Sequence, residues 1–163
     1  MIYSKLENKY IPVQITSSSN YISNYGLFTR YQVKDKRIPI GYVDLRDTKN
    51  GVYVEFIKNQ NPDLYTKFGE LADQIEVEHC LKRGLKNFEI KSHAGLNSHA
   101  LHFLRGKRFV DELINKTVEN IIKNTPKGAL FNTKSLKKVE MYMPQDLIKK
   151  YLKLIKRNPL ILK

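Results

Sequence analysis

Hydrophobic and polar positions alternate in three neighbouring segments near the start of the chain. Residues 27–33, 38–45 and 52–57 are rich in β-branched and aromatic side chains, which is typical of strands. A charged turn at 34–37 separates the first two segments. Residues 47–51 end in Asn-Gly, a strong hairpin signal, and separate the last two. The pattern predicts an antiparallel meander.

The period changes to that of a helix after this meander. Leu71, Ala72, Ile75 and His79 recur at helical spacing, which predicts a helix over about 67–83. Gly84 follows Lys82-Arg83, where a glycine after a helix belongs. A further strand is predicted over 85–92. Strand, helix and strand in this order form a βαβ unit, which is expected to be parallel and right-handed.

Weaker patterns predict the rest of the chain. Residues 1–24 contain the cluster Thr16–Asn20, which is a loop signal. A short helix is expected to begin at Asn97, a good N-cap residue. The other expected elements are a helix over 110–124, a strand over 138–143 and a helix from 144 to about 157. No repeat or long linker divides the sequence, so we expect a single domain over residues 1–163.

Composition narrows the class of protein. With 163 residues, 41% of them hydrophobic, the chain is long and apolar enough to form a core. Cys80 is the one cysteine, so no intrachain disulfide can form, which fits a reducing compartment. On a predicted helix it is expected to be a small core residue. The N-terminus has no apolar segment typical of a signal peptide, and no run is long enough to span a membrane. A cytoplasmic protein is expected.

Charge is distributed unevenly along the chain. The net charge is +13, and residues 116–163 carry +9 of it, from twelve basic and three acidic side chains. The basic C-terminal strand and helix, about 126–163, favour a polyanionic partner such as nucleic acid, an acidic protein, a membrane surface or a phosphorylated cofactor. A solvated basic face that serves solubility explains the charge equally well.

Residues 97–109 carry a family resemblance. They read Asn97-Ser-His-Ala100-Leu-His-Phe103-Leu-Arg-Gly-Lys-Arg-Phe109. This segment resembles the Asn-x-x-Ala-x-x-Leu-Tyr-x-x-x-Gly-Phe motif of the GCN5-related N-acetyltransferases (GNAT). Leu104 stands where that family has Tyr. The resemblance, with the order of elements before it, implies a GNAT-like α/β (α+β) fold in which helices flank a mixed central sheet.

The same resemblance implies a site for acetyl-CoA or another acyl-CoA. In the family, backbone amides before the third helix hold the pyrophosphate, and the matching segment here is Leu64–Gly69. Gly69 matches the family pattern, whereas Lys67 replaces a glycine and could bring a positive charge to a phosphate. Lys67, Phe68 and Gly69 are therefore candidate cofactor-binding residues. Asn97 and Phe103 are added from the motif.

Acyl transfer also needs a base and a group that polarises the thioester carbonyl. The resemblance implies that amides near Phe56 and Ile57 polarise the carbonyl. Glu55 on the same strand is the candidate base, and His93 is a second candidate base or substrate contact. A tyrosine elsewhere could supply the acid in place of Leu104; the candidates are Tyr10, Tyr25, Tyr42 and Tyr65.

Two function classes follow. The first is an N-acyltransferase that moves an acyl group from acyl-CoA to an amine. The alternative is an inactive GNAT-fold protein that binds nucleic acid or a protein partner through the basic C-terminal region. Four histidines, at positions 79, 93, 99 and 102, lack the spacing of known metal motifs, so no metal is expected.

Overall fold

The computed structural model describes residues 1–22, 26–95, 98–160 and 162, and it divides the chain into two compact units. Unit 1 comprises Met1–Ile90 and Lys150–Lys163, and unit 2 comprises Lys91–Lys149. Both units contain strands and helices, so the α/β (α+β) fold class is confirmed. The expectation of a single domain stays a prediction.

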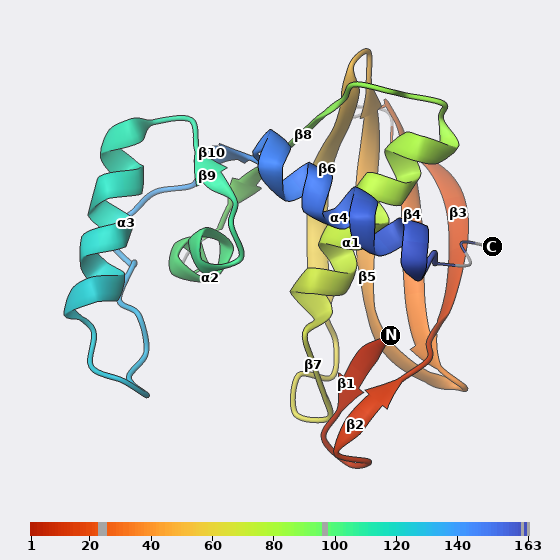
Figure 1. The fold of residues 1–163 in the computed structure, drawn as a ribbon, viewed down its shortest axis with the longest axis horizontal. Helices are drawn as coiled ribbons and strands as arrows, with labels where there is room; N and C mark the ends of the chain where they lie inside the picture. Colours follow the sequence, from red (N-terminus) through yellow and green to blue (C-terminus); the bar gives the residue numbers. More distant parts are fainter. Residues whose placement is uncertain (23–25, 96–97, 161, 163) are drawn as a thin grey trace. The chain divides into compact units, whose positions relative to one another are not determined.

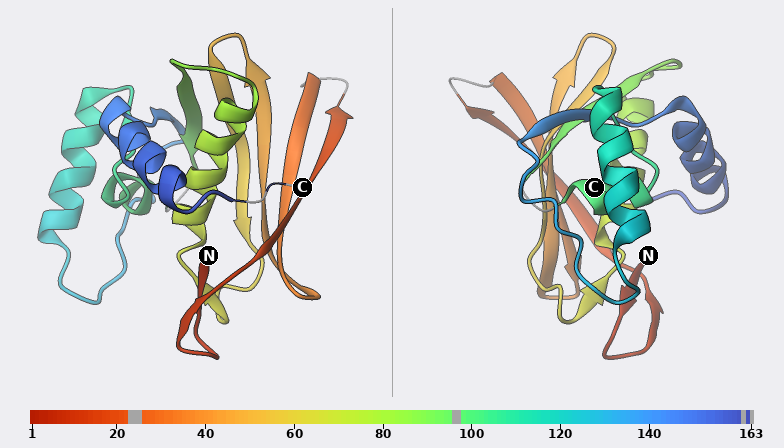
Figure 2. Two further views of the ribbon diagram at one scale, coloured as in Figure 1. Left: turned by 45° about the vertical axis from the view of Figure 1, so that its right-hand side comes forward. Right: turned by 90° about the vertical axis from the view of Figure 1, so that its left-hand side faces the viewer.

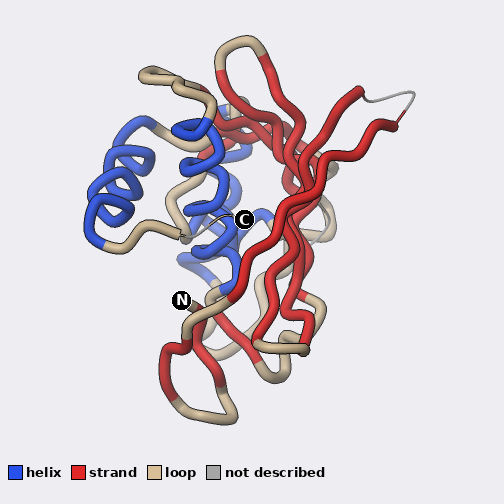
Figure 3. Tube along the Cα trace, turned by 90° about the vertical axis from the view of Figure 1, so that its right-hand side faces the viewer, coloured by secondary structure: helices blue, strands red, loops and turns tan. Residues whose placement is uncertain are grey.

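Unit 1 is built on long antiparallel strands. β3 (Gln14–Ile22), β4 (Gly26–Asp35), β5 (Ile38–Thr48) and β6 (Gly51–Asn59) pair in sequence order. They form a twisted layer, seen from two sides in Figures 2 and 3. The meander predicted from residues 27–57 is therefore confirmed, and the Asn50-Gly51 turn joins β5 to β6 as expected.

The first part of the chain differs from the prediction. Residues 1–24 include β1 (Ile2–Ser4), β2 (Lys9–Ile11) and β3, so the loop expected at Thr16–Asn20 was wrong. β3 pairs with β4 along its whole length, which supplies the backbone hydrogen bonds. The side chains of residues 16–19 are exposed on both faces of the strand. No hydrophobic alternation therefore marked this strand. β1 pairs with both β2 and β7 (Tyr65–Thr66).

Helix α1 (Phe68–Lys82) covers one face of the long strands (Figure 1). A Cβ added to Gly41 of β5 would lie 2.7 Å from the Phe68 ring, which shows how closely the helix approaches. Residues 71–80 of α1 are all buried. The helix ends at Lys82 with Arg83 as its C-cap, and Gly84 follows with a φ of 74°, as predicted from its position.

The C-terminal segment runs along the other side of α1. Gln74, Glu78 and Lys82 follow one another at four-residue spacing on the helix. Gln74 Nε2 donates to the Asn158 carbonyl at 3.0 Å, and Lys82 Nζ donates to the Leu162 carbonyl at 2.6 Å. Between them, the Leu160 amide donates to Glu78 Oε1 at 2.8 Å. These bonds explain why α1 has buried polar residues on the side away from the strands.

Unit 2 contains a smaller set of elements. β8 (Glu89–Ala94) pairs antiparallel with β10 (Val139–Tyr142), which pairs in turn with β9 (Arg108–Phe109). The helices are α2 (His99–Leu104) and α3 (Glu112–Asn124), and α3 is prominent in the right-hand view of Figure 2. Their shared core consists of Ala94, Ala100, Phe109, Val118, Leu136 and Met141. β8 begins in unit 1, and α4 (Gln145–Arg157) begins in unit 2 and ends in unit 1.

Side-chain caps and local bonds explain these later elements. Asp111 accepts a bond from the Leu113 amide at 2.8 Å and so starts α3. Asn115 binds both the amide and the carbonyl of Phe109, which ties α3 to β9. Ser98 is the N-cap of α2. The predicted N-cap, Asn97, lies outside the described residues. None of the helices described has the length and apolar character needed to cross a membrane.

Candidate functional site

A β-bulge in β6 is the first feature of the candidate site. Asp44 of β5 pairs with Phe56, but the next residue, Leu45, pairs with Val54. Glu55 is therefore an extra residue that the ladder skips. Bulges of this kind bend a strand, interrupt its pairing and are frequent next to active sites. The bulge falls at the strand position where the sequence placed the carbonyl-polarising amides and the base.

The side chains of Glu55, Phe56 and Ile57 at the bulge lie in different environments. Arg46 Nε donates to Glu55 Oε1 at 2.7 Å, so the candidate base is part of an ion pair. Phe56 is 65% exposed, and Ile57 is half-buried. An amine that gives its proton to Glu55 must compete with the Arg46 guanidinium for that carboxylate.

The loop between β6 and α1 is held by a dense set of hydrogen bonds. The Asn61 carbonyl accepts from the amides of Leu64 and Tyr65, at 3.1 and 3.0 Å. Asn59 Nδ2 donates to the Tyr65 carbonyl at 3.0 Å, and the Lys5 amide donates to the Leu64 carbonyl at 2.8 Å. These bonds hold the loop in place up to Tyr65, three residues before α1 begins.

Lys67 stands at the start of α1 in a left-handed conformation, with φ 67° and ψ 15°. This region favours glycine, the residue that the family motif has here. As at the start of any helix, the amides of Phe68, Gly69 and Glu70 have no partner inside the helix, and the Lys67 side chain does not cap them. Lys67 Nζ lies 3.1 Å from Glu70 Oε1, and this contact raises the pKa of Lys67. The Phe68 ring is buried, so only its backbone is available to a ligand.

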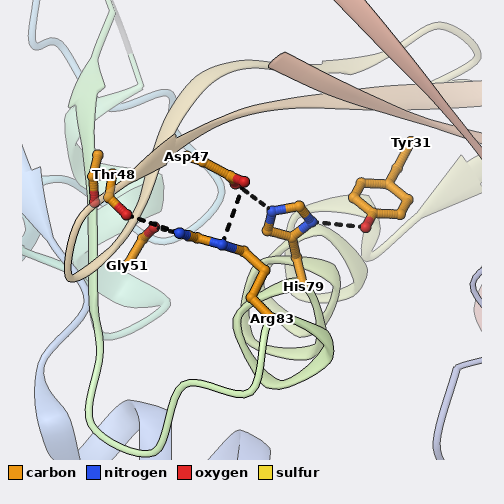
Figure 4. A network of polar contacts seen from close by, with 6 residues as sticks. All are labelled: Tyr31, Asp47, Thr48, Gly51, His79 and Arg83. Atoms are coloured by element: carbon orange, nitrogen blue, oxygen red, sulfur yellow. Dashed lines mark hydrogen bonds and ion pairs between the residues drawn. The ribbon is translucent and has the colours of Figure 1, made fainter. Parts of the chain in front are cut away.

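A polar network lies at the other end of α1 (Figure 4). The Tyr31 hydroxyl is 2.8 Å from His79 Nδ1, and His79 Nε2 is 2.7 Å from Asp47 Oδ1. Arg83 Nε lies 3.3 Å from Asp47 Oδ2. The Arg83 guanidinium also donates to the carbonyls of Thr48, at 2.9 Å, and Gly51.

The network fixes α1 to the β5–β6 hairpin. Tyr31 comes from β4, Asp47 from β5 and His79 from α1, while Arg83 binds the turn that precedes β6. Burial raises the pKa of Tyr31 to about 12, so its hydroxyl stays protonated at neutral pH. The network therefore holds in place the two elements, α1 and β6, that carry the candidate site.

The remaining candidates belong to unit 2 or lie outside the described residues. His93 of β8 is exposed, and the partial burial of its ring together with nearby Lys138 lowers its pKa. Phe103 packs against the core of unit 2, with the Arg108 guanidinium 4.1 Å from its ring centre. Asn97 lies outside the described residues. Unit 1 thus holds the predicted residues Glu55, Phe56, Ile57, Lys67, Phe68 and Gly69, at the bulge and at the start of α1.

The candidate proton donors occupy different environments. Tyr65 is buried, and burial together with the bond from its hydroxyl to Asp35 raises its pKa. Tyr42 stacks on Arg30, and Tyr10 is exposed. Tyr25 is not among the described residues. Leu104, at the family's tyrosine position, is exposed.

Sequence reasoning missed both the bulge and the network. A bulge has no signature in a single strand, since it is defined by pairing with the neighbour. His79 was placed on the correct helix, but its partners Tyr31 and Asp47 are 48 and 32 residues away in sequence. Among the described residues, no group of three or more His, Cys, Asp or Glu side chains is arranged to hold a metal ion.

Among solved structures, three acetyltransferases are similar to this chain. No family model and no curated protein match the chain. A proposed N-acetyltransferase from Lactobacillus plantarum is 14% identical, with a TM-score of 0.48 over 71% of this chain and 68% of that one. A Bacillus subtilis acetyltransferase in complex with CoA is 15% identical, with a TM-score of 0.48 over 80% and 98%. A proposed GNAT-family acetyltransferase from Bacteroides thetaiotaomicron is 18% identical, with a TM-score of 0.34 over 86% and 78%. All three of these acetyltransferases are less than 20% identical to this chain in sequence.

Proposed function

We propose that the chain is an acyl-CoA-dependent N-acyltransferase, which moves an acetyl or other acyl group from acyl-CoA to an amine. The observation that carries this proposal is the bulge at Glu55. A bulge interrupts the ladder and leaves its extra residue, here Glu55, without a partner in β5, and a backbone amide outside the ladder is what an acyl transferase needs beside its thioester carbonyl. The bulge occurs on the strand directly before the loop that leads to α1.

The start of α1 is the proposed site for the phosphates of the acyl-CoA. The amides of Phe68, Gly69 and Glu70 are free of helical partners, and the helix dipole favours an anion at this end. Lys67 adds a positive charge. Glu70 in the same turn is an anion that already occupies this position, so a bound phosphate has to displace it from Lys67. Asn97 and Phe103 remain proposed cofactor contacts.

The proposed reaction follows from the groups at the bulge. The amine nitrogen attacks the carbonyl carbon of the thioester, and backbone amides at the bulge, near Phe56 and Ile57, stabilise the negative charge on the carbonyl oxygen. Glu55, or His93, takes the proton from the amine as the C–N bond forms. The C–S bond then breaks and releases CoA as a thiolate. The hydrocarbon side chain of Leu104 cannot supply a proton, so the thiolate takes one from solvent or from one of the candidate tyrosines.

The single cysteine of the chain fits a reducing compartment. Cys80 is buried in α1 and forms no disulfide. We therefore place the proposed enzyme in the cytoplasm, where acyl-CoA is an available donor.

Thermal unfolding with acetyl-CoA tests the proposal. A ligand at one hundred times its Kd stabilises the folded state by about 2.7 kcal/mol, which raises the Tm of a chain of this size by roughly 5–10 °C. Pantetheine, which lacks the nucleotide phosphates, should give a much smaller shift. Lys67→Glu should weaken the effect of acetyl-CoA, while Lys49→Glu, an equal change at an exposed lysine in the β5–β6 turn, should not. If millimolar acetyl-CoA leaves the Tm of the wild-type chain unchanged, the proposal is wrong.

A further inference from the structure

The face of the long strands away from α1 carries an ordered array of aromatic and charged side chains. Side chains alternate between the faces of a strand, and Gly41, Val43 and Leu45 of β5 face α1. Tyr42, Asp44 and Arg46 therefore lie on the opposite side, here called the open face. In unit 1, no described helix packs on this face. The register places cross-strand neighbours in three rows: Gln32–Tyr42–Lys58, Arg30–Asp44–Phe56 and Phe28–Arg46–Tyr53.

Carboxylates on the open face orient its two arginines. Asp44 binds Arg30 with both oxygens, at 2.7 and 2.6 Å, and the Arg30 guanidinium lies 4.2 Å from the centre of the Tyr42 ring. Glu55 binds Arg46 at 2.7 Å, and the Arg46 guanidinium lies 4.9 Å from the centre of the Tyr53 ring. Each arginine is about one-third exposed. The open face thus presents two fixed guanidinium planes, each stacked on an aromatic ring.

Phe56 is the most exposed aromatic side chain of the open face, at 65%. The bulge at Glu55 is the reason that it lies there, because the extra residue shifts the alternation of β6 by one position. Without the bulge, residue 56 would fall on the same face as Val52 and Val54, which are buried. The bulge therefore turns a phenylalanine to the surface, next to Lys58, whose side chain is also exposed.

The charges on this face favour a polyanion that carries flat rings. Its cations are Arg30, Arg46 and Lys58, against the carboxylates of Asp44 and Glu55, and Asp44 is buried beneath Arg30. These three cations and two carboxylates leave one surplus positive charge on the face, in a chain whose net charge is +13. Single-stranded nucleic acids bind to proteins by stacking bases on aromatic rings and guanidinium planes, while cations attract the phosphates.

We propose that the open face binds single-stranded nucleic acid, with bases stacked on Phe56 and on the Arg46–Tyr53 pair. Lys58 contacts the phosphate backbone beside them. Stacking of this kind is tolerant of sequence, since every base has an aromatic face. This proposal does not rest on acyl transfer, although Phe56 and the Arg46–Glu55 ion pair lie at the same bulge as the proposed catalytic groups. It does not involve the basic residues of α4, such as Lys150 and Lys153.

Fluorescence anisotropy with a labelled twelve-nucleotide oligouridylate at low salt tests the proposal. Phe56→Ala should weaken binding about 5- to 150-fold, the range for loss of one stacking ring. Leu6→Ala, an equally exposed apolar side chain on the β1–β2 turn, is the matched control and should bind like the wild-type chain. Lys58→Ala should lower the slope of log affinity against log salt by about 0.7, the value for one lost phosphate contact on a single strand.

The same assay gives the results that would overturn the proposal. One is a wild-type chain that does not bind the oligonucleotide at low salt. Another is equal binding by the wild-type and Phe56→Ala chains, with far-UV circular dichroism showing that both are folded. A third is binding that depends on α4 alone, so that Lys150→Ala/Lys153→Ala abolishes it and Phe56→Ala does not. The thermal shift measures acetyl-CoA binding and the anisotropy assay measures oligonucleotide binding. Each proposal can therefore fail without contradicting the other.

Discussion

Tyr31→Phe is the sharpest test of how α1 is held against the sheet. The substitution removes one oxygen atom and keeps the ring, so the packing of the buried side chain is preserved. It also removes the group 2.8 Å from His79 Nδ1. Tyr31 and His79 are both buried, so water cannot readily replace the lost hydroxyl. His79 keeps its bond to Asp47 but is left with one buried nitrogen that has no partner.

The expected cost follows from that unpartnered nitrogen. Leaving a buried polar group without a hydrogen bond costs about 1–3 kcal/mol. For a chain of this size each kcal/mol lowers the Tm by about 2–4 °C, so the variant should melt roughly 2–12 °C below the wild-type chain. Urea unfolding followed by circular dichroism gives the free energy directly. Tyr10→Phe is the control, because Tyr10 is 51% exposed and its change should stay within about 0.5 kcal/mol.

The result for Tyr31→Phe can contradict this reasoning. If its free energy of unfolding lies within about 0.5 kcal/mol of the wild-type value, the Tyr31–His79 bond does not hold α1. A combined Tyr31→Phe/Asp47→Asn variant adds a second check. Residues in one hydrogen-bond network show a coupling energy of about 0.5–3 kcal/mol, whereas purely additive losses would mean that the contacts act separately.

Four other changes test separate parts of the structure. Lys67→Gly should stabilise the chain by up to about 1 kcal/mol in urea unfolding, because Lys67 has a φ of 67° that glycine adopts without strain; an unchanged or lower stability contradicts this. Gly51→Ala should destabilise strongly, since its Cβ would lie 1.9 Å from the Glu89 carbonyl oxygen, and a wild-type Tm would show that contact to be absent. Burial raises the pKa of Glu78 above its usual 4.5, so the folded state holds this proton more tightly than the unfolded chain and loses stability as the pH rises above about 4.5. Glu78→Gln, which keeps an oxygen for the Leu160 amide, should flatten that decline. Burial raises the pKa of Cys80 to about 12, so a thiol reagent at pH 8 should label it only in denaturant, and rapid labelling of the native chain would contradict its burial.

The sequence predicted those elements whose signals are local. The Asn50-Gly51 turn fixed the β5–β6 hairpin, because this pair readily adopts the backbone that a tight turn requires. The apolar spacing around Ile75 gave α1 to within one residue at each end, and Gly84 marked where the helix stops. In each case a few neighbouring residues determine the structure, so no knowledge of the rest of the chain was needed.

Other features depend on partners far away in sequence. The serines of β3 read as a loop, and only pairing with β4 makes them a strand. The bulge at Glu55 is likewise defined by β5, which skips that residue. Asn158 and Leu160 carry no signal for an extended segment that binds Gln74 and Glu78 of α1. The candidate base and the phosphate-binding turn came from the family resemblance, while the strand geometry that supports them came from the structure.

Isothermal titration calorimetry of the chain with acetyl-CoA tests the central proposal most directly. Saturable heat with a stoichiometry near one is expected for the wild-type chain, with weaker binding by Lys67→Glu and unchanged binding by Lys49→Glu. Glu55→Gln should bind acetyl-CoA like the wild-type chain, because Glu55 is proposed to act on the amine. Absence of heat from the folded wild-type chain at millimolar acetyl-CoA, or equal binding by the Lys67→Glu variant, would contradict an acyl-CoA site at the start of α1.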